Sequence, residues 1–287
     1  MNYFLLFLTA LFIIFQKITQ DRYNAKRDSG VFFFSGMISF FAMCFFMTVN
    51  CDWTWSNRLI LPAVAFGLSY AAATVFVVLA IKCGSLAKTT LITSYSLLVP
   101  ALAGLIVLRE PLGISMIVGI ILLVISLWLT NRRKTLTDTS AEKMTVKWII
   151  FVLLGFVGNG MCSTVQKLTP HFLGADINQN LYMIVALSLS SAVLITASFL
   201  TKETGLKDTL HIGAPLSLFC GLFNGAVNYL AIYLNQFIPA SVMFPVLSAG
   251  EIILIVPYAL LVRREKFTAA QWMGFGVGVV SVVLLNL

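Results

Sequence analysis

Long apolar runs separated by short polar links dominate the pattern of this chain. A helix rises about 1.5 Å per residue and needs about 20 apolar residues to cross the hydrocarbon core of a bilayer. The runs are continuous rather than alternating, which favours helices over the strands of a barrel. We therefore predict an all-α polytopic membrane protein with ten transmembrane helices, at residues 3–15 (lengthened by 16–20), 30–50, 59–81, 89–108, 112–130, 148–166, 180–200, 212–235, 239–262 and 268–287.

The composition excludes a soluble globule, because 59% of the residues are hydrophobic and only 10% are charged. The first run begins at residue 3 without a basic segment before it, so we expect an anchor and not a removed signal peptide. The five cysteines show no CxxC spacing and no adjacent histidine. We expect no cofactor and no metal, and we interpret these cysteines as small packing residues.

The basic residues predict the orientation of the chain. All of the nineteen Lys and Arg residues except Arg58, Arg109 and Lys167 lie in links after odd-numbered spans. Cytoplasmic links carry an excess of Lys and Arg, so the odd links should be cytoplasmic and both termini outside. The net charge of +8 thus indicates topology and gives no reason to expect a nucleic-acid partner. All five tryptophans lie near span ends, as an interfacial aromatic belt would place them: Trp53, Trp55, Trp128, Trp148 and Trp272.

The two halves of the chain resemble each other. Gln16-Lys17-Ile18-Thr19 matches Gln166-Lys167-Leu168-Thr169, 150 residues later. The segments after the fourth and ninth spans match at a displacement of 155, pairing Arg109 with Arg264, Glu110 with Glu265, Gly119 with Gly274 and Ser126 with Ser281. Because each half has five spans, the second copy enters the membrane inverted. We predict two five-helix repeats, residues 1–130 and 148–287, joined by a basic cytoplasmic linker, residues 131–147; such inverted repeats are typical of secondary transporters.

Glu251 lies near the centre of the ninth span, about twelve residues from either end. A charged side chain at that depth costs at least about 2.5–3.5 kcal/mol, so it usually faces a bundle interior or a watery cavity. The other acidic residues fall at or beyond the ends of the runs, and no Lys or Arg lies in the middle of a span. Three interpretations stand: a carboxylate that takes up a proton during transport, one that pairs with a cationic substrate, or a protonated structural residue.

Polar residues three or four positions apart share a helix face and mark further candidates for a substrate site. Asn224 and Asn228 lie on a stripe of small and amide side chains that either bonds a neighbouring helix or binds substrate. Comparable stripes occur in the third, fourth, sixth and ninth spans. The substrate-binding candidates are Glu251, Asn224, Asn228, Asn159, Tyr95, Tyr70, Thr93 and Ser248. Pro245 and Pro257 are candidate breaks in the ninth span. Spans 2, 5, 7 and 10 suit lipid contact and close packing instead.

The paired Arg-Glu-Pro and Arg-Arg-Glu elements, each followed by a glycine-bearing hydrophobic helix, resemble the drug/metabolite transporter superfamily in its ten-helix bacterial branch (EamA-like). The resemblance covers essentially the whole chain. It implies two inverted five-helix repeats in a bacterial plasma membrane, with helices 1, 3, 4, 6, 8 and 9 around a central cavity. It also implies transport of amino acids, sugars, nucleotide sugars, choline-like amines or drugs.

The function predicted from the sequence is that of a secondary active transporter, not an enzyme. It would move a small polar metabolite, such as an amine or amino acid, by alternating access, with proton coupling through Glu251 as one option. An exporter of cationic drugs or quaternary amines is the alternative, and a channel or a membrane-embedded enzyme belongs to another class. The expected partners are a small-molecule substrate, the lipid bilayer and protons; a monomer is one option for the oligomeric state.

Overall fold

A computed structural model describes residues 2–27, 29–97, 99–100, 103, 114–131, 145–174, 178–204, 206–234, 237, 240–265 and 267–284. These residues form helices and no strand. The elements are α1 (Asn2–Lys26), α2 (Val31–Val49), η1 (Asn57–Leu59), α3 (Ile60–Cys83), α4 (Leu86–Ser94), η2 (Tyr95–Leu97), α6 (Ile114–Asn131), α7 (Val146–Leu173), α8 (Gln179–Leu200), α9 (Leu206–Leu234), α10 (Ala240–Leu261) and α11 (Ala269–Leu284).

Six of these helices are long and apolar enough to cross a membrane, and they identify a helical membrane-embedded protein. They contain residues 4–26, 31–49, 57–83, 146–169, 179–200 and 207–234. Shorter apolar helical stretches occupy residues 117–126 and 250–261. Arg109, Glu110 and most of the linker 131–147 lie outside the described residues, as do most positions of the expected span 89–108 beyond residue 100.

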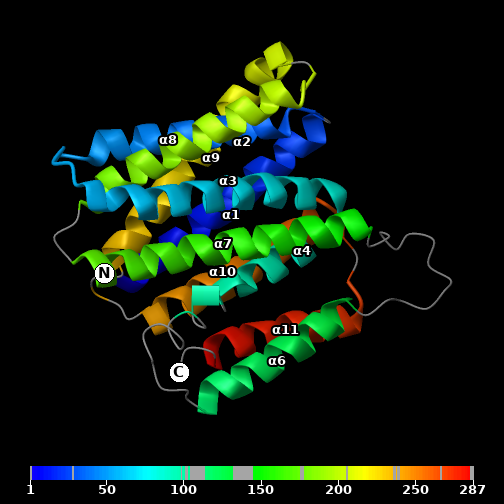
Figure 1. The fold of residues 1–287 in the computed structure, drawn as a ribbon. Coiled ribbons are helices and arrows are strands. Elements are labelled where there is room, and N and C mark those ends of the chain that lie inside the picture. Colours follow the sequence, from blue (N-terminus) through cyan, green and yellow to red (C-terminus); the bar gives the residue numbers. More distant parts are fainter. Residues whose placement is uncertain are drawn as a thin grey trace.

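The helices form one bundle, and the helix axes run roughly from left to right in Figure 1. α1 packs against α3, α9 and α10, while α2 lies between α8 and α9. α3 packs along α7, and α6 and α11 form a separate pair at the edge of the bundle (Figure 1). The links after α1, α3, α8 and α10 lie on the right of this view, whereas the link after α2 and the end of α7 lie on the left (Figure 1).

The fourth span is broken where it meets the centre of the bundle. α4 ends at Ser94 and continues as the 3₁₀ turn η2. Pro100 provides a reason, because proline lacks the N–H of a helical hydrogen bond and its ring clashes with the carbonyl four residues before it, here that of Ser96. The breaks expected at Pro245 and Pro257 do not form, since α10 is helical throughout Ala240–Leu261.

Glycine allows the close approach of α7 to α3. A Cβ at Gly158 would lie 2.8 Å from the backbone nitrogen of Ala73, which cannot move aside without shifting the helix. In α11, by contrast, a Cβ at Gly276 would meet nothing within 4 Å. We expect Gly158→Ala to destabilise the protein by about 1–3 kcal/mol through overpacking. Gly276→Ala should be neutral or slightly stabilising, because alanine favours helix. Thermal unfolding in detergent tests this pair, and equal effects would contradict the packing.

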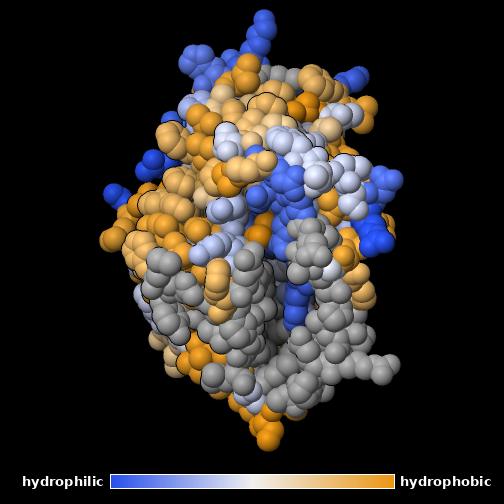
Figure 2. All heavy atoms as spheres, turned by 90° about the vertical axis from the view of Figure 1, so that its left-hand side faces the viewer, coloured by the Kyte–Doolittle hydropathy of each residue, from blue (hydrophilic) through white to orange (hydrophobic). Residues whose placement is uncertain are grey.

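The outer surface carries the apolar side chains expected to face lipid. Ile114, Ile121, Val124 and Trp128 of α6 are all more than half exposed. Hydrophobic residues cover the flanks of the molecule in Figure 2. Trp53, Trp55 and Trp272 are exposed as well, as the aromatic-belt prediction requires.

Trp148 corrects that prediction, because its side chain is only 2% exposed. It lies against Gly84, and its Nε1–H donates to Thr89 Oγ1 over 3.0 Å. It therefore anchors the start of α7 to α4 from inside the bundle.

Asp52 organises the link between α2 and α3. It accepts hydrogen bonds from the hydroxyl of Thr54 (2.8 Å) and from the Thr54 backbone N–H (3.0 Å), and these bonds lower the pKa of the carboxyl group. The Asn178 amide, at the start of α8, donates to the backbone carbonyl of Asp52 (2.6 Å). The loop after α2 is thereby joined to the beginning of α8.

Candidate functional site

A cavity of about 220 Å³ lies at the centre of the bundle. It is lined by residues of α1, α3, α4 with η2, α7, α9 and α10, and by Ile38 of α2. These are the six spans that the family resemblance implies around a cavity. Its lining is mixed, with amide, hydroxyl and charged groups beside apolar side chains such as Ile13, Phe66, Val77 and Leu247.

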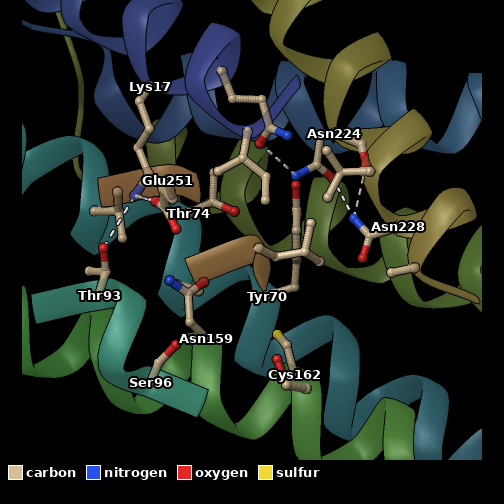
Figure 3. A pocket seen from close by; sticks show the side chains of 18 of the residues that line it. Lys17, Tyr70, Thr74, Thr93, Ser96, Asn159, Cys162, Asn224, Asn228 and Glu251 are labelled. Atoms are coloured by element: carbon tan, nitrogen blue, oxygen red, sulfur yellow. Dashed lines mark hydrogen bonds and ion pairs between the residues drawn. The ribbon is translucent and has the colours of Figure 1, made fainter. Parts of the chain in front are cut away.

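An ion pair joins α1 to α10 in the wall of this cavity. Lys17 Nζ lies 3.5 Å from Glu251 Oε1, and the two side chains are 9% and 11% exposed. Lys17 also donates to Thr93 Oγ1 (3.3 Å), and the hydroxyl of Ser94 donates to Glu251 Oε2 (3.1 Å). Figure 3 shows the Lys17 ammonium between Glu251 and Thr93. Three elements therefore meet at this pair: α1, α4 and α10.

Lys17 corrects the expectation that Glu251 has no cationic partner within the protein. The sequence placed Lys17 in a cytoplasmic link, but α1 continues to Lys26 and Lys17 is buried. Asp21 is likewise only 6% exposed, although it was placed beyond the first apolar run. The signal was the helical spacing of Gln16, Gln20 and Asn24, which extends a polar face along α1.

An amide cluster forms the opposite side of the cavity. Asn224 Nδ2 of α9 donates to Gln16 Oε1 of α1 (3.0 Å), and Asn228 Nδ2 donates to the Oδ1 and the backbone oxygen of Asn224 (both 3.0 Å). Figure 3 shows these bonds facing the cavity. Asn224 thus bonds a neighbouring helix and also lines the space where a substrate would lie. A structural role and a substrate-binding role of this side chain are therefore compatible.

Six of the eight predicted site residues line the cavity: Glu251, Asn224, Asn228, Asn159, Tyr70 and Thr93. Tyr95 does not, because its hydroxyl forms a 2.7 Å hydrogen bond with Ser126 Oγ of α6. It belongs to an apolar core cluster between α4 and α10. The side chain of Ser248 lies outside the described part of the chain. Sequence reasoning missed Lys17, Ser94 and Gln20 as lining residues.

A cluster of buried apolar residues lies between the cavity and the right-hand end of the bundle in Figure 1. Ile81 of α3, Leu86 of α4, and Ile255 and Ala259 of α10 belong to one core cluster and are fully buried. They lie nearer that end of their helices than the cavity residues Val77, Thr93 and Glu251 do. Solutes in the cavity therefore meet an apolar barrier in this direction.

A polar latch holds α10 to α1 and α4 beyond this barrier. Asp21 Oδ2 accepts from the hydroxyl of Tyr258 (3.0 Å), and Asp21 Oδ1 lies 3.0 Å from Arg263 Nε. Glu265 accepts from the Ser85 hydroxyl (2.6 Å) and from the Leu86 backbone N–H (2.9 Å). We call these contacts the α10 latch. Because Glu265 caps the positive end of α4, it couples the end of α10 to the helix that carries Thr93 and Ser94.

Among the described residues, no group of three or more His, Cys, Asp or Glu side chains has an arrangement that could hold a metal ion. The five cysteines are free. Cys162 and Cys220 are buried, as packing residues should be, whereas Cys51 and Cys83 are exposed. The cavity wall itself offers the Lys17–Glu251 ion pair and the hydrogen-bonding groups of the amide cluster.

Comparisons with known proteins show the fold alone. No protein-family model and no curated protein matches the chain. Solved structures do match. One of them, described only as the crystal structure of a protein, superposes with a TM-score of 0.65 and 11% sequence identity, over 98% of this chain and 94% of its own. The architecture therefore exists in a protein of nearly the same extent, at an identity too low to transfer function.

Proposed function

We propose that this protein is a secondary active transporter that moves a small polar metabolite across the bacterial plasma membrane by alternating access. The observation that carries the proposal is the buried Lys17–Glu251 pair in the wall of a central polar cavity, where α1, α4 and α10 meet. Buried ionisable groups within membrane helices mark substrate and ion pathways. In secondary transporters, the substrate site lies near the midplane.

A two-fold relation between the halves supports the proposal. Ser126 Oγ donates to the Gly274 carbonyl (2.6 Å), and Ser281 Oγ donates to the Gly119 carbonyl (2.8 Å). A shift of 155 residues converts Ser126 to Ser281 and Gly119 to Gly274, so the two bonds are reciprocal. The helix contacts follow the same relation between the halves, in which α1 corresponds to α7 and α3 corresponds to α9. α3 packs on α7, and α9 packs on α1. On this basis we propose ten spans in two inverted repeats, 1–130 and 148–287, joined by the linker 131–147.

The state of the cavity also supports a carrier. Figure 2 views the left-hand side of the molecule in Figure 1, and hydrophilic surface of described residues is visible near the centre of that face. Toward the opposite side lie the apolar barrier and the α10 latch. If the odd links are cytoplasmic, the apolar barrier lies between the cavity and the cytoplasm. A carrier needs one closed side in each state, whereas a conducting channel does not.

The Lys17–Glu251 ion pair makes some of the proposed roles of Glu251 less favourable than others. The hypotheses of proton coupling through Glu251 and of cationic-drug export both assumed that Glu251 has no cationic partner in the protein. In the structure, however, Lys17 lies 3.5 Å from Glu251. We therefore favour a substrate-binding role for Glu251 over a role in proton uptake.

Flux measurements test the proposed function. Purified protein in liposomes should show saturable uptake that is accelerated by unlabelled solute on the opposite side, which is counterflow. A pore would give uptake that does not saturate and shows no counterflow. An absence of protein-dependent flux for amino acids, amines, sugars and organic acids would contradict the transporter proposal.

Two native cysteines test the proposed topology. Cys51 follows α2 and Cys83 ends α3, and both are exposed. A membrane-impermeant maleimide added to intact cells should label Cys51 and not Cys83, and permeabilised cells should show labelling of both. Cys51→Ser and Cys83→Ser identify the two signals. Labelling of Cys83 from outside would reverse the orientation that the basic links predict.

A further inference from the structure

We infer that the cavity selects a small zwitterion, a solute that carries one ammonium and one carboxylate on a short spacer. The inference rests on the proposed function and names its substrate class. Lys17 would bind the carboxylate of the solute, and Glu251 would bind its ammonium group. The amide cluster around Asn224 would bond the remaining polar groups.

The charge balance of the cavity favours a zwitterion. Among the described lining residues, Lys17 and Glu251 are the charged ones, and their charges cancel. A buried charge that loses its partner is strongly destabilising, whereas a buried pair that keeps its partners is not. A monocation bound to Glu251 would leave Lys17 uncompensated, and a monoanion bound to Lys17 would leave Glu251 uncompensated. A zwitterion inserted between them converts one internal pair into two pairs with the solute.

The hydrogen-bond partners around the pair suit such an exchange. In the structure Lys17 also donates to Thr93 Oγ1, and Glu251 also accepts from the Ser94 hydroxyl, which lies within reach of the Thr90 carbonyl as well. Both partners lie at the end of α4, directly before the break at η2. Each charged group therefore has one hydrogen-bond partner on α4 besides the ion pair, and we expect it to keep this partner when a solute enters between Lys17 and Glu251.

The size of the cavity limits the solute. At about 220 Å³, it is smaller than typical sites for drug-sized ligands, which are about 300–1,000 Å³. The apolar part of the lining, including Phe66 and Val77, provides room for one small aliphatic or aromatic group. A small α-amino acid fits these requirements, whereas a large cationic drug does not.

Matched solutes test the inference by binding, independently of transport. Thermal unfolding of the purified full-length protein is measured with small α-amino acids, with the amine made by removing each carboxyl group, and with the acid made by removing each amino group. L-leucine, isoamylamine and 4-methylpentanoate form one such set. We expect a zwitterion to stabilise the protein and its amine and acid to bind at least about tenfold more weakly, a difference of 1.4 kcal/mol. Stabilisation by an amine, an acid or a sugar at equal strength, or by no member of the panel, overturns the inference.

Flux separates this inference from the proposed function. A zwitterion that binds but shows no counterflow would support the site and contradict the carrier. Counterflow of an amine, an acid or a sugar alone would support the carrier and overturn the inference.

Charge variants give a readout that does not depend on the amount of folded protein. Lys17→Gln should shift the ratio of binding toward the amine, because the site is left negative, and Glu251→Gln should shift it toward the acid. The reversed pair Lys17→Glu/Glu251→Lys should again prefer the zwitterion and provides a neutral site if the single variants fold poorly. Unchanged ratios in all folded variants would overturn the assignment.

Discussion

Lys17→Met should lower the free energy of unfolding by about 3–5 kcal/mol, because it leaves the buried Glu251 carboxylate without its cation. Glu251→Leu should cost a similar amount by leaving Lys17 unpaired. The double variant Lys17→Met/Glu251→Leu should cost much less than the sum of the two, since no buried charge remains. Chemical unfolding in detergent, arranged as a double-mutant cycle, measures this coupling.

A surface pair of the same length provides the control. Arg27 Nη1 and Asp208 Oδ2 also lie 3.5 Å apart, but the Asp208 side chain is 69% exposed. Exposed pairs contribute about 0–1 kcal/mol, so Asp208→Asn should change stability little. Additive effects at Lys17 and Glu251 would show that the two side chains do not form a compensated pair.

Glu265→Ala should open the cavity toward the cytoplasmic side in the proposed topology. This substitution removes the bonds to the Ser85 hydroxyl and the Leu86 N–H, which hold α10 to α4. Hydrogen bonds to charged groups contribute about 1.5–3 kcal/mol each, and 1.4 kcal/mol is a factor of ten in an equilibrium. We therefore expect labelling of a reporter cysteine at Ser96, in a background without the native cysteines, to become at least about tenfold faster from the cytoplasmic side.

Glu203 supplies a matched control for the α10 latch. It also caps a helix with two bonds, to the backbone N–H groups of Phe32 (2.9 Å) and Phe33 (3.0 Å) at the start of α2. It joins the link after α8 to α2, and α2 contributes only Ile38 to the cavity lining. Glu203→Ala should reduce stability without exposing the reporter. Equal labelling of both variants would show general loosening of the bundle and would contradict a specific role of the latch.

Helical spacing predicted several residues of the cavity wall. Asn224 and Asn228, Tyr70 and Asn159 line it because polar residues three or four apart share a face that lipid excludes. Tyr95, a candidate placed beside the polar face of the fourth span, does not line the cavity. The chain enters a 3₁₀ turn there, with three residues per turn, and the Tyr95 hydroxyl finds Ser126 instead. Periodicity assigns a face only while the helix stays regular.

The charged pair was harder to predict from the sequence. A lysine near the end of an apolar run has the same local signature whether it anchors the helix at the interface or continues into the bundle. Lys17 is buried because the 25-residue α1 extends past it and because Glu251, 234 positions later, lies beside it. Trp148 shows the same limit, since its burial depends on Gly84 of a distant segment. Contacts between segments that are remote in the sequence determine the burial of both Lys17 and Trp148.

The most direct measurement of the central claim is a structure of the protein with a transported solute bound. The account predicts that the solute lies in the central cavity between Lys17 and Glu251, with their Nζ and Oε1 atoms separated beyond the 3.5 Å seen here. A solute bound elsewhere, with this pair intact, would contradict it.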